Sequence, residues 1–149
     1  MPTATMAAHL RNELAREGLV VRPNLIQTLW RFIERWVGDL PQISDPAYAL
    51  LVERTVRRLS LPAFAKVEDF AGFHAMLART LEELSTAGLD AGTLEKHLTT
   101  PLGQALVKVH REVSRAISAK HLGSRTDRLR LAAERIGKGE AAELKTVWP

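Results

Sequence analysis

The sequence predicts a mostly α-helical protein, in which a helical insertion domain is bracketed by short strands of an incomplete α/β domain. Apolar residues recur at spacings of three and four through most of the 149 residues, as they do in helices with one buried face. Two short runs, one near each end of the chain, have the composition of strands. Because the first run lies between two predicted helices, it follows the pattern of an α/β layer.

Residues 1–38 are expected to form the partial α/β domain, in the order helix, strand, helix. The first helix covers residues 5–17 and stops at Gly18. Its apolar stripe consists of Met6, Leu10 and Leu14. Residues 19–22 form the predicted strand, which Pro23 closes. Thr28 can cap the next helix, which ends at Gly38. Its inward-facing residues are Leu29, Phe32, Ile33, Trp36 and Val37.

Residues 39–138 form the predicted helical insertion domain, and its central helix lies within residues 67–90. Asp69 is placed to cap this helix and Gly88 to end it. The apolar stripe consists of Phe70, Phe73, Leu77, Leu81 and Leu84. A stripe this regular requires partner helices, so the helix is expected to form the core of the domain.

The partner helices are expected on both sides of the central one. Asp45-Pro46 begins a helix that runs toward Pro62. Its stripe consists of Tyr48, Leu51, Val52, Thr55, Val56 and Leu59. A helical turn over residues 93–98 precedes a helix from Thr100-Pro101 to residue 122, stopped by Gly123. Its inner residues are Leu102, Leu106, Val109, Val113 and Ile117.

Ser124 or Thr126 can cap the last helix, which residues 137–139 break. The apolar residues that align along it are Leu129, Ala132, Ala133 and Ile136. Residues 139–149 are expected to return to the α/β domain, with the second strand over residues 143–148.

Composition limits the possible functions. The chain lacks cysteine, which excludes disulfides, thiolate catalysis and Cys-ligated zinc. No apolar run approaches the roughly 20 residues of a membrane span, and the N-terminus lacks a signal-peptide pattern, so a cytoplasmic protein without a membrane partner is expected. Of the net charge of +4, residues 108–138 supply nine basic and three acidic residues, or +6, which leaves −2 elsewhere. Such a stretch fits a nucleic-acid-facing surface or a solvated face of arginine-rich helices.

No combination of residues predicts an active site. The histidines have no spacing that places two metal ligands on one helical turn, and His74 is expected to lie in the core. Adjacent acids such as Glu82-Glu83 point about 100° apart on a helix and cannot share a proton. Neither a nucleophile elbow nor a glycine-rich phosphate loop is present. No catalytic residue, metal or cofactor is therefore expected in this chain, and whether it belongs to an enzyme stays open.

Two sets of residues are candidates for nucleic-acid binding. Lys108, Arg111 and Arg115 recur along one side of a predicted helix, where they can meet a phosphate backbone. Trp30 and Arg31 follow the first predicted strand, and an aromatic side chain beside an arginine can stack on an unpaired base. The alternative is that Trp30 packs against a neighbouring helix.

Three stretches, taken in order, carry a resemblance to a known family. Residues 2–37 place a strand-like run before a Thr-containing turn and helix, and residues 64–90 combine a phenylalanine-containing turn, Gly72-Phe73 and a helix ending in Glu-Leu and Ala-Gly. Residues 109–136 place an Asp-Arg stretch before an Ala-Ala helix. This order resembles the N-terminal region of the B subunit of AddAB-type ATP-dependent helicase–nucleases, which belong to the UvrD-like helicase superfamily and carry a PD-(D/E)XK nuclease.

The resemblance implies a fragment, made of the start of a helicase-like core and most of its helical insertion domain. The incomplete α/β domain would then be of the P-loop type. The family processes DNA ends in recombinational repair together with a helicase–nuclease A subunit. ATP, Mg²⁺ and an iron–sulfur cluster are the cofactors implied for the parent protein, and they and the nuclease motif lie outside this segment, so no catalytic residue is carried over. Thr28 matches a position where related helicases touch single-stranded DNA.

The expected function is therefore a noncatalytic contribution of scaffold and single-stranded DNA contact to a double-strand-break repair helicase–nuclease subunit. The residues expected to contact DNA are Thr28, Trp30, Arg31, Lys108, Arg111 and Arg115. The alternative is a free-standing helical adaptor that binds a partner protein.

Overall fold

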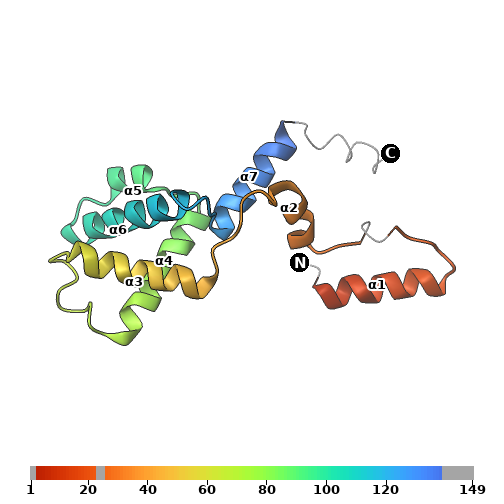
Figure 1. Cartoon of the computed structure of the whole chain (residues 1–149), viewed down its shortest axis with the longest axis horizontal. Coiled ribbons are helices and arrows are strands. Elements are labelled where there is room, and N and C mark those ends of the chain that lie inside the picture. Colours follow the sequence, from red (N-terminus) through yellow and green to blue (C-terminus); the bar gives the residue numbers. More distant parts are fainter. Residues whose placement is uncertain (1–2, 23–25, 139–149) are drawn as a thin grey trace. The chain divides into compact units, whose positions relative to one another are not determined.

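The computed structural model describes residues 3–22 and 26–138, and in these ranges it contains seven helices and no strand (Figure 1). The helices are α1 (Ala4–Arg16), α2 (Leu29–Val37), α3 (Asp45–Leu59), α4 (Ala71–Thr86), α5 (Ala91–His97), α6 (Pro101–Ser118) and α7 (Arg125–Gly137). The chain divides into two compact units. The first unit comprises residues up to Asp39 and from Arg128 onward, and the second unit is Leu40–Asp127. The sequence predicts these boundaries after residues 38 and 138, so the structure places the second one within α7.

The mostly helical fold predicted from the sequence is confirmed, whereas the first strand is a wrong prediction. Residues 19–22 have no regular structure, and Leu19 and Val20 are 53% and 102% exposed. A strand needs partners for its backbone groups, and within the described residues the only bridge pairs Gln42 with Gly123. The second predicted strand, over residues 143–148, lies outside the described residues, as does the segment 139–149.

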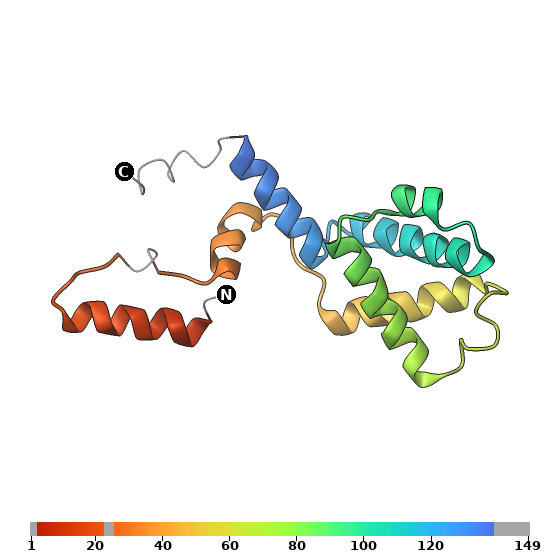
Figure 2. The ribbon, with the colours of Figure 1, turned by 180° about the vertical axis from the view of Figure 1, so that it is seen from behind.

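In the second unit, α3 packs against both α4 and α6, and α5 packs on α6. Helices α3 and α6 run antiparallel in both views (Figures 1 and 2). The core consists of Val52, Val56, Phe64, Leu77, Ala78, Leu81, Ala105, Val109, Val113 and Ile117. The predicted stripes of these helices supply most of it. Leu102 is an exception, since it was expected inside but is 60% exposed.

The start of the central helix differs from the prediction. Helix α4 begins at Ala71, and Asp69 does not cap it; Phe70 occupies the cap position and is 65% exposed. Upstream of it the backbone forms successive turns, in which the amides of Phe64 and Val67 donate to the carbonyls three residues before them. These turns place Phe64 in the core, where its ring lies 5.2 Å from that of Phe73. At the other end, Gly88 has φ +80°, as predicted for the residue that ends the helix.

The end of α6 also differs from the prediction. The helix stops at Ser118, before Gly123, and the backbone turns through His121 at φ +53°. This turn lets the Gly123 amide donate to the Pro41 carbonyl and the Gly123 carbonyl accept from the Ile43 amide. The segment before α3 is thereby fastened to the segment before α7. Ser124, one of the two predicted caps, is the residue that accepts from the Asp127 amide at the start of α7.

The first unit is built around α2 and the part of α7 from Arg128 onward. Thr28 caps α2 as predicted, because its hydroxyl accepts from the Arg31 amide. Ile33, Val37 and Ala132 are buried together, and the residues that pack against them are Trp30, Trp36, Leu129 and Leu131. In α1, Ala7 is buried, but Met6 and Leu10 of the predicted stripe are 60% and 50% exposed.

A substitution at Gly103 can test how tightly the start of α6 is packed. A Cβ added at Gly103 would lie 2.8 Å from the Leu98 Cβ, whereas one added at Gly72 in α4 meets nothing within 4 Å. Gly103→Ala should therefore lower the free energy of unfolding by about 1–3 kcal/mol. Gly72→Ala should raise it by about 0.4–1 kcal/mol, because alanine favours the helix and limits the unfolded chain. Urea unfolding followed by circular dichroism measures both, and similar effects of the two changes would contradict the packing.

Candidate nucleic-acid interface

The three candidate residues of α6 lie on its outward-facing side. Lys108 and Arg115 are exposed and Arg111 is partly exposed. Arg111 donates to Glu95 of α5 at 2.7 Å, and Arg115 donates to Glu112 at 3.0 Å. No ion pair of Lys108 is found among the described residues. The α6 part of the prediction thus corresponds to one continuous surface, although two of its three cations already have acidic neighbours.

Helix α3 adds cations that the sequence analysis did not identify. Arg58 donates to Glu112 at 2.9 Å, so one carboxylate holds an arginine from each helix. Arg54 is exposed and lies one helical turn before Arg58, on the same side of α3. The α3/α6 seam is defined here as Arg54, Arg58, Lys108, Arg111, Glu112 and Arg115. With Glu95 included, five basic residues face two acidic ones, a net +3.

The other three candidates belong to the first unit and have local structural roles. The Thr28 hydroxyl is engaged in capping α2, and Trp30 is partly buried against the cluster of Ile33, Val37 and Ala132. The surroundings of Trp30 therefore support the alternative that this side chain packs against a neighbouring helix. Arg31 is exposed in the first turn of the helix. These residues and the seam lie in different units of the chain.

Part of the positive charge of residues 108–138 stabilises the first unit. The Arg128 side chain is 5% exposed and donates to Glu34 at 2.8 Å. Arg135 binds both carboxylate oxygens of Asp39, at 2.8 and 2.7 Å, and also donates to the Trp36 carbonyl. The hydrogen bond from Arg135 is the main reason why the pKa of Asp39 is lowered. These two arginines hold α7 to α2 and are not available as a charged surface.

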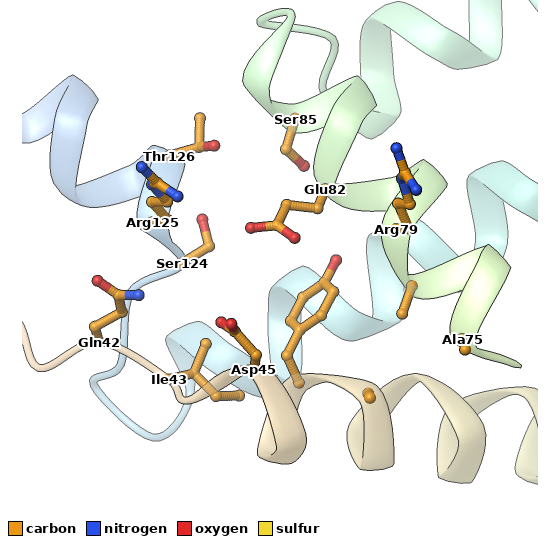
Figure 3. Close-up of a pocket in the computed structure, with 13 residues that line it drawn as sticks. Gln42, Ile43, Asp45, Ala75, Arg79, Glu82, Ser85, Ser124, Arg125 and Thr126 are labelled. Atoms are coloured by element: carbon orange, nitrogen blue, oxygen red, sulfur yellow. The ribbon is translucent and has the colours of Figure 1, made fainter. Parts of the chain in front are cut away.

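A cavity of about 220 Å³ lies within the second unit. It is lined by Gln42 and Ile43, the start of α3, the α4 face from Ala75 to Ser85, and residues 124–126. Figure 3 shows the carboxylates of Asp45 and Glu82 and the hydroxyls of Ser85 and Ser124 directed toward a common space. Tyr48 also lines it, and burial, followed by the negative charges of Glu82 and Asp127, raises the pKa of Tyr48 to about 12. A tyrosine with this pKa is protonated at neutral pH and acts as a hydrogen-bonding group.

Ser85 and His110 form the pair in this region that most resembles catalytic machinery. The Ser85 Oγ lies 3.0 Å from the His110 Nε2, whereas the buried His110 Nδ1 has no hydrogen-bond partner. Because a buried N–H without an acceptor costs more than an unused lone pair, the proton belongs on Nε2, which then donates to Ser85. In that tautomer His110 cannot accept the serine proton. The pair therefore fastens α4 to α6 and does not activate a nucleophile.

No group of three or more His, Cys, Asp or Glu side chains able to hold a metal is found in residues 3–22 and 26–138. None of the helices in these ranges combines the length and the hydropathy that a membrane-spanning helix requires. No family model matches the chain, and no similar protein was found among curated proteins or among solved structures.

Because His110 is buried, we expect the folded protein to lose stability in acid. Burial lowers the pKa of its imidazole, and the charges of Asp90 and Asp127 only partly oppose this effect. The unfolded chain, with a histidine pKa of about 6.5, then binds more protons than the folded chain. The free energy of unfolding should fall as the pH drops from about 6.5 and level off below the folded-state pKa.

The variant His110→Gln removes this titration and should flatten the pH dependence of the free energy of unfolding, measured with urea at several pH values. His97→Gln is the matched control, because it changes an exposed histidine and should keep the wild-type dependence. An unchanged slope in His110→Gln would show that His110 does not titrate differently on folding.

Proposed function

We propose that the chain is a noncatalytic, mostly helical part of a DNA double-strand-break repair subunit of the helicase–nuclease type, and that it contributes scaffold and single-stranded DNA contact. The observation that carries the DNA contact is the α3/α6 seam, where basic side chains from two packed helices form one surface. The order of segments supports the assignment to this class of repair protein. In this proposal the parent protein supplies ATP hydrolysis and nuclease chemistry elsewhere, together with its A subunit.

The ion pairs within the seam are compatible with phosphate binding. The side chains of Arg58 and Arg115 are 62% and 71% exposed. Exposed ion pairs contribute only about 0–1 kcal/mol, so exchanging Glu112 for a phosphate costs little. A guanidinium can also bind phosphate with two parallel hydrogen bonds, which a single carboxylate contact does not provide. Glu112 thus holds two arginines near each other, and both guanidinium groups remain exposed enough to contact a phosphate.

The surface favours the backbone of a nucleic acid over its bases. Guanidinium and ammonium groups contact phosphates, and these contacts fix position without reading sequence. The described part of the seam contains no aromatic side chain, so base stacking would have to come from elsewhere. The affinity should accordingly be modest and strongly dependent on salt.

A second candidate function, a helical adaptor that binds a partner protein, is favoured by α1. Met6 and Leu10 expose an apolar stripe on this helix, and such stripes are typical of helices that pack on another protein. The two candidates differ in what they predict for DNA. An adaptor has no need for the seam and should bind oligonucleotides no better than an unrelated basic protein does.

The test is the binding of fluorescein-labelled oligothymidylate to the full chain, measured by fluorescence anisotropy. With about three to five phosphate contacts, the affinity should fall about twentyfold to about a hundredfold between about 50 mM and about 200 mM salt. Arg58→Gln and Arg115→Gln should each weaken binding and reduce the salt dependence. Glu112→Gln should tighten it, because the change removes an acidic group that both arginines contact.

Arg57→Gln is the matched control, since Arg57 neighbours Arg58 in α3 but pairs with Glu53. It should leave binding nearly unchanged. No binding at low salt, or binding that is insensitive to salt, would contradict the DNA contact and favour the adaptor. Equal effects of Arg57→Gln and Arg58→Gln would show that total charge, and not the seam, is responsible.

A further inference from the structure

The exposed side of α6 carries a narrow charged strip that lies between two neighbouring helices. Helix α6 packs against α3 and α5, and both views show it between them (Figures 1 and 2). The α6 strip is defined here as Lys108, Arg111, Glu112 and Arg115. Their spacing of three and four keeps them within about 100° of one another around the helix. Glu112 binds Arg58 and so marks the α3 border of the strip, whereas Arg111 binds Glu95 and marks the α5 border.

The two borders differ in which charge lies outermost. On the α3 border the Glu112 side chain is 28% exposed, whereas the side chains of Arg58 and Arg115, which bind it, are 62% and 71% exposed. On the α5 border the order is reversed, because Glu95 is 50% exposed and Arg111 is 34% exposed. A polyanion that approaches the strip therefore meets arginines along the α3 border and a carboxylate along the α5 border.

The cations on and beside the α3 border are arranged along the helix axes. Lys108 and Arg115 are seven positions apart, which corresponds to about 10 Å along α6. Arg54 and Arg58 of α3 are one helical turn apart, and they extend along the same line because α3 runs antiparallel to α6 (Figures 1 and 2). The phosphates of a stacked strand follow one another at about 3.4 Å along its axis. A strand that lies lengthwise therefore places about four consecutive phosphates beside these four cations.

A strand that crosses the helices would meet a less favourable set of charges. On the way from α5 to α3 it would pass over the exposed carboxylate of Glu95 before it reached the α6 strip. Neighbouring helix axes lie about 8–10 Å apart, so a path over three helices spans about 16–20 Å and about six to seven phosphates. The number of phosphates that the surface holds therefore distinguishes the two paths.

We propose that the α3/α6 seam binds a single nucleic-acid strand lengthwise, over about four consecutive phosphates, along the α3 border of the α6 strip and away from Glu95. This proposal rests on the proposed DNA contact, and it adds the path of the strand and the length of the bound segment. In this arrangement Arg54 is a binding residue, whereas the basic residues of α5 are not.

The test is a length series. Unlabelled oligothymidylates from the trimer to the decamer, all without terminal phosphates, compete with a fluorescein-labelled decamer for the full chain at about 50 mM salt. The pentamer carries four phosphates. Once each affinity is divided by the number of registers that the oligonucleotide offers, it should rise about threefold to tenfold with each added phosphate up to the pentamer. Beyond the pentamer it should change less than about twofold.

Two exposed basic residues, one from each neighbouring helix, test the path. Arg54→Gln should weaken binding of the pentamer about threefold to tenfold. Lys96→Gln is the matched control, since it removes one charge from α5 next to Glu95 and should leave the affinity nearly unchanged.

The proposal is overturned if the corrected affinity keeps rising to the heptamer or beyond, or if Lys96→Gln weakens binding as much as Arg54→Gln does. A decamer that binds with the expected salt dependence but shows either of these results leaves the DNA contact intact and refutes only the path. A decamer that does not bind at low salt contradicts the DNA contact itself, and this proposal with it.

Discussion

The packing of α3 against α4 and α6 is the constraint on which the rest of the second unit depends. Val52 and Val56 of α3 are fully buried with Leu81 of α4 and Val109 of α6. Burying such side chains stabilises the fold by about 1.5–3 kcal/mol each and fixes the rotation of every helix about its own axis. Once that rotation is set, the outward positions are set too. One flank of α3 then meets the charged side of α6, and the flank toward α4 borders the cavity.

Helix α3 therefore lies between a charged surface and a cavity. On its α6 side, Arg58 shares the Glu112 carboxylate with Arg115, and cations outnumber acids. On its α4 side, Asp45 and Glu82 face a cavity lined by hydroxyl groups. The hydrogen bonds between Gly123 and residues 41–43 hold the cavity's remaining wall in place, because they fasten the chain before α7 to the chain before α3. The same packing thus positions a surface with a net positive charge and a cavity lined by polar side chains.

Periodicity and capping predict the helices well, because both depend on residues close together in sequence. Thr28 and Gly88 act at helix ends as their types suggest. The features that the sequence did not predict correctly depend on contacts between residues that are not adjacent in sequence. A strand at residues 19–22 would need partners that the described chain does not supply, and the burial of Phe64 depends on turns that bring it onto Phe73. The α6 part of the seam follows from spacing, but its α3 part depends on a pairing between residues 54 positions apart. Charge counting also overstated the basic surface, since Arg128 and Arg135 bind Glu34 and Asp39.

We infer that the seam, and not the chain's overall positive charge, contacts nucleic acid. This inference can be tested by recording amide chemical shifts of the ¹⁵N-labelled full chain while a short oligothymidylate is added at low salt. We expect the largest shifts in residues 54–58 of α3 and 108–115 of α6, with the cavity residues of α4 little affected. Shifts confined to the first unit, or spread evenly over every basic residue, would contradict it.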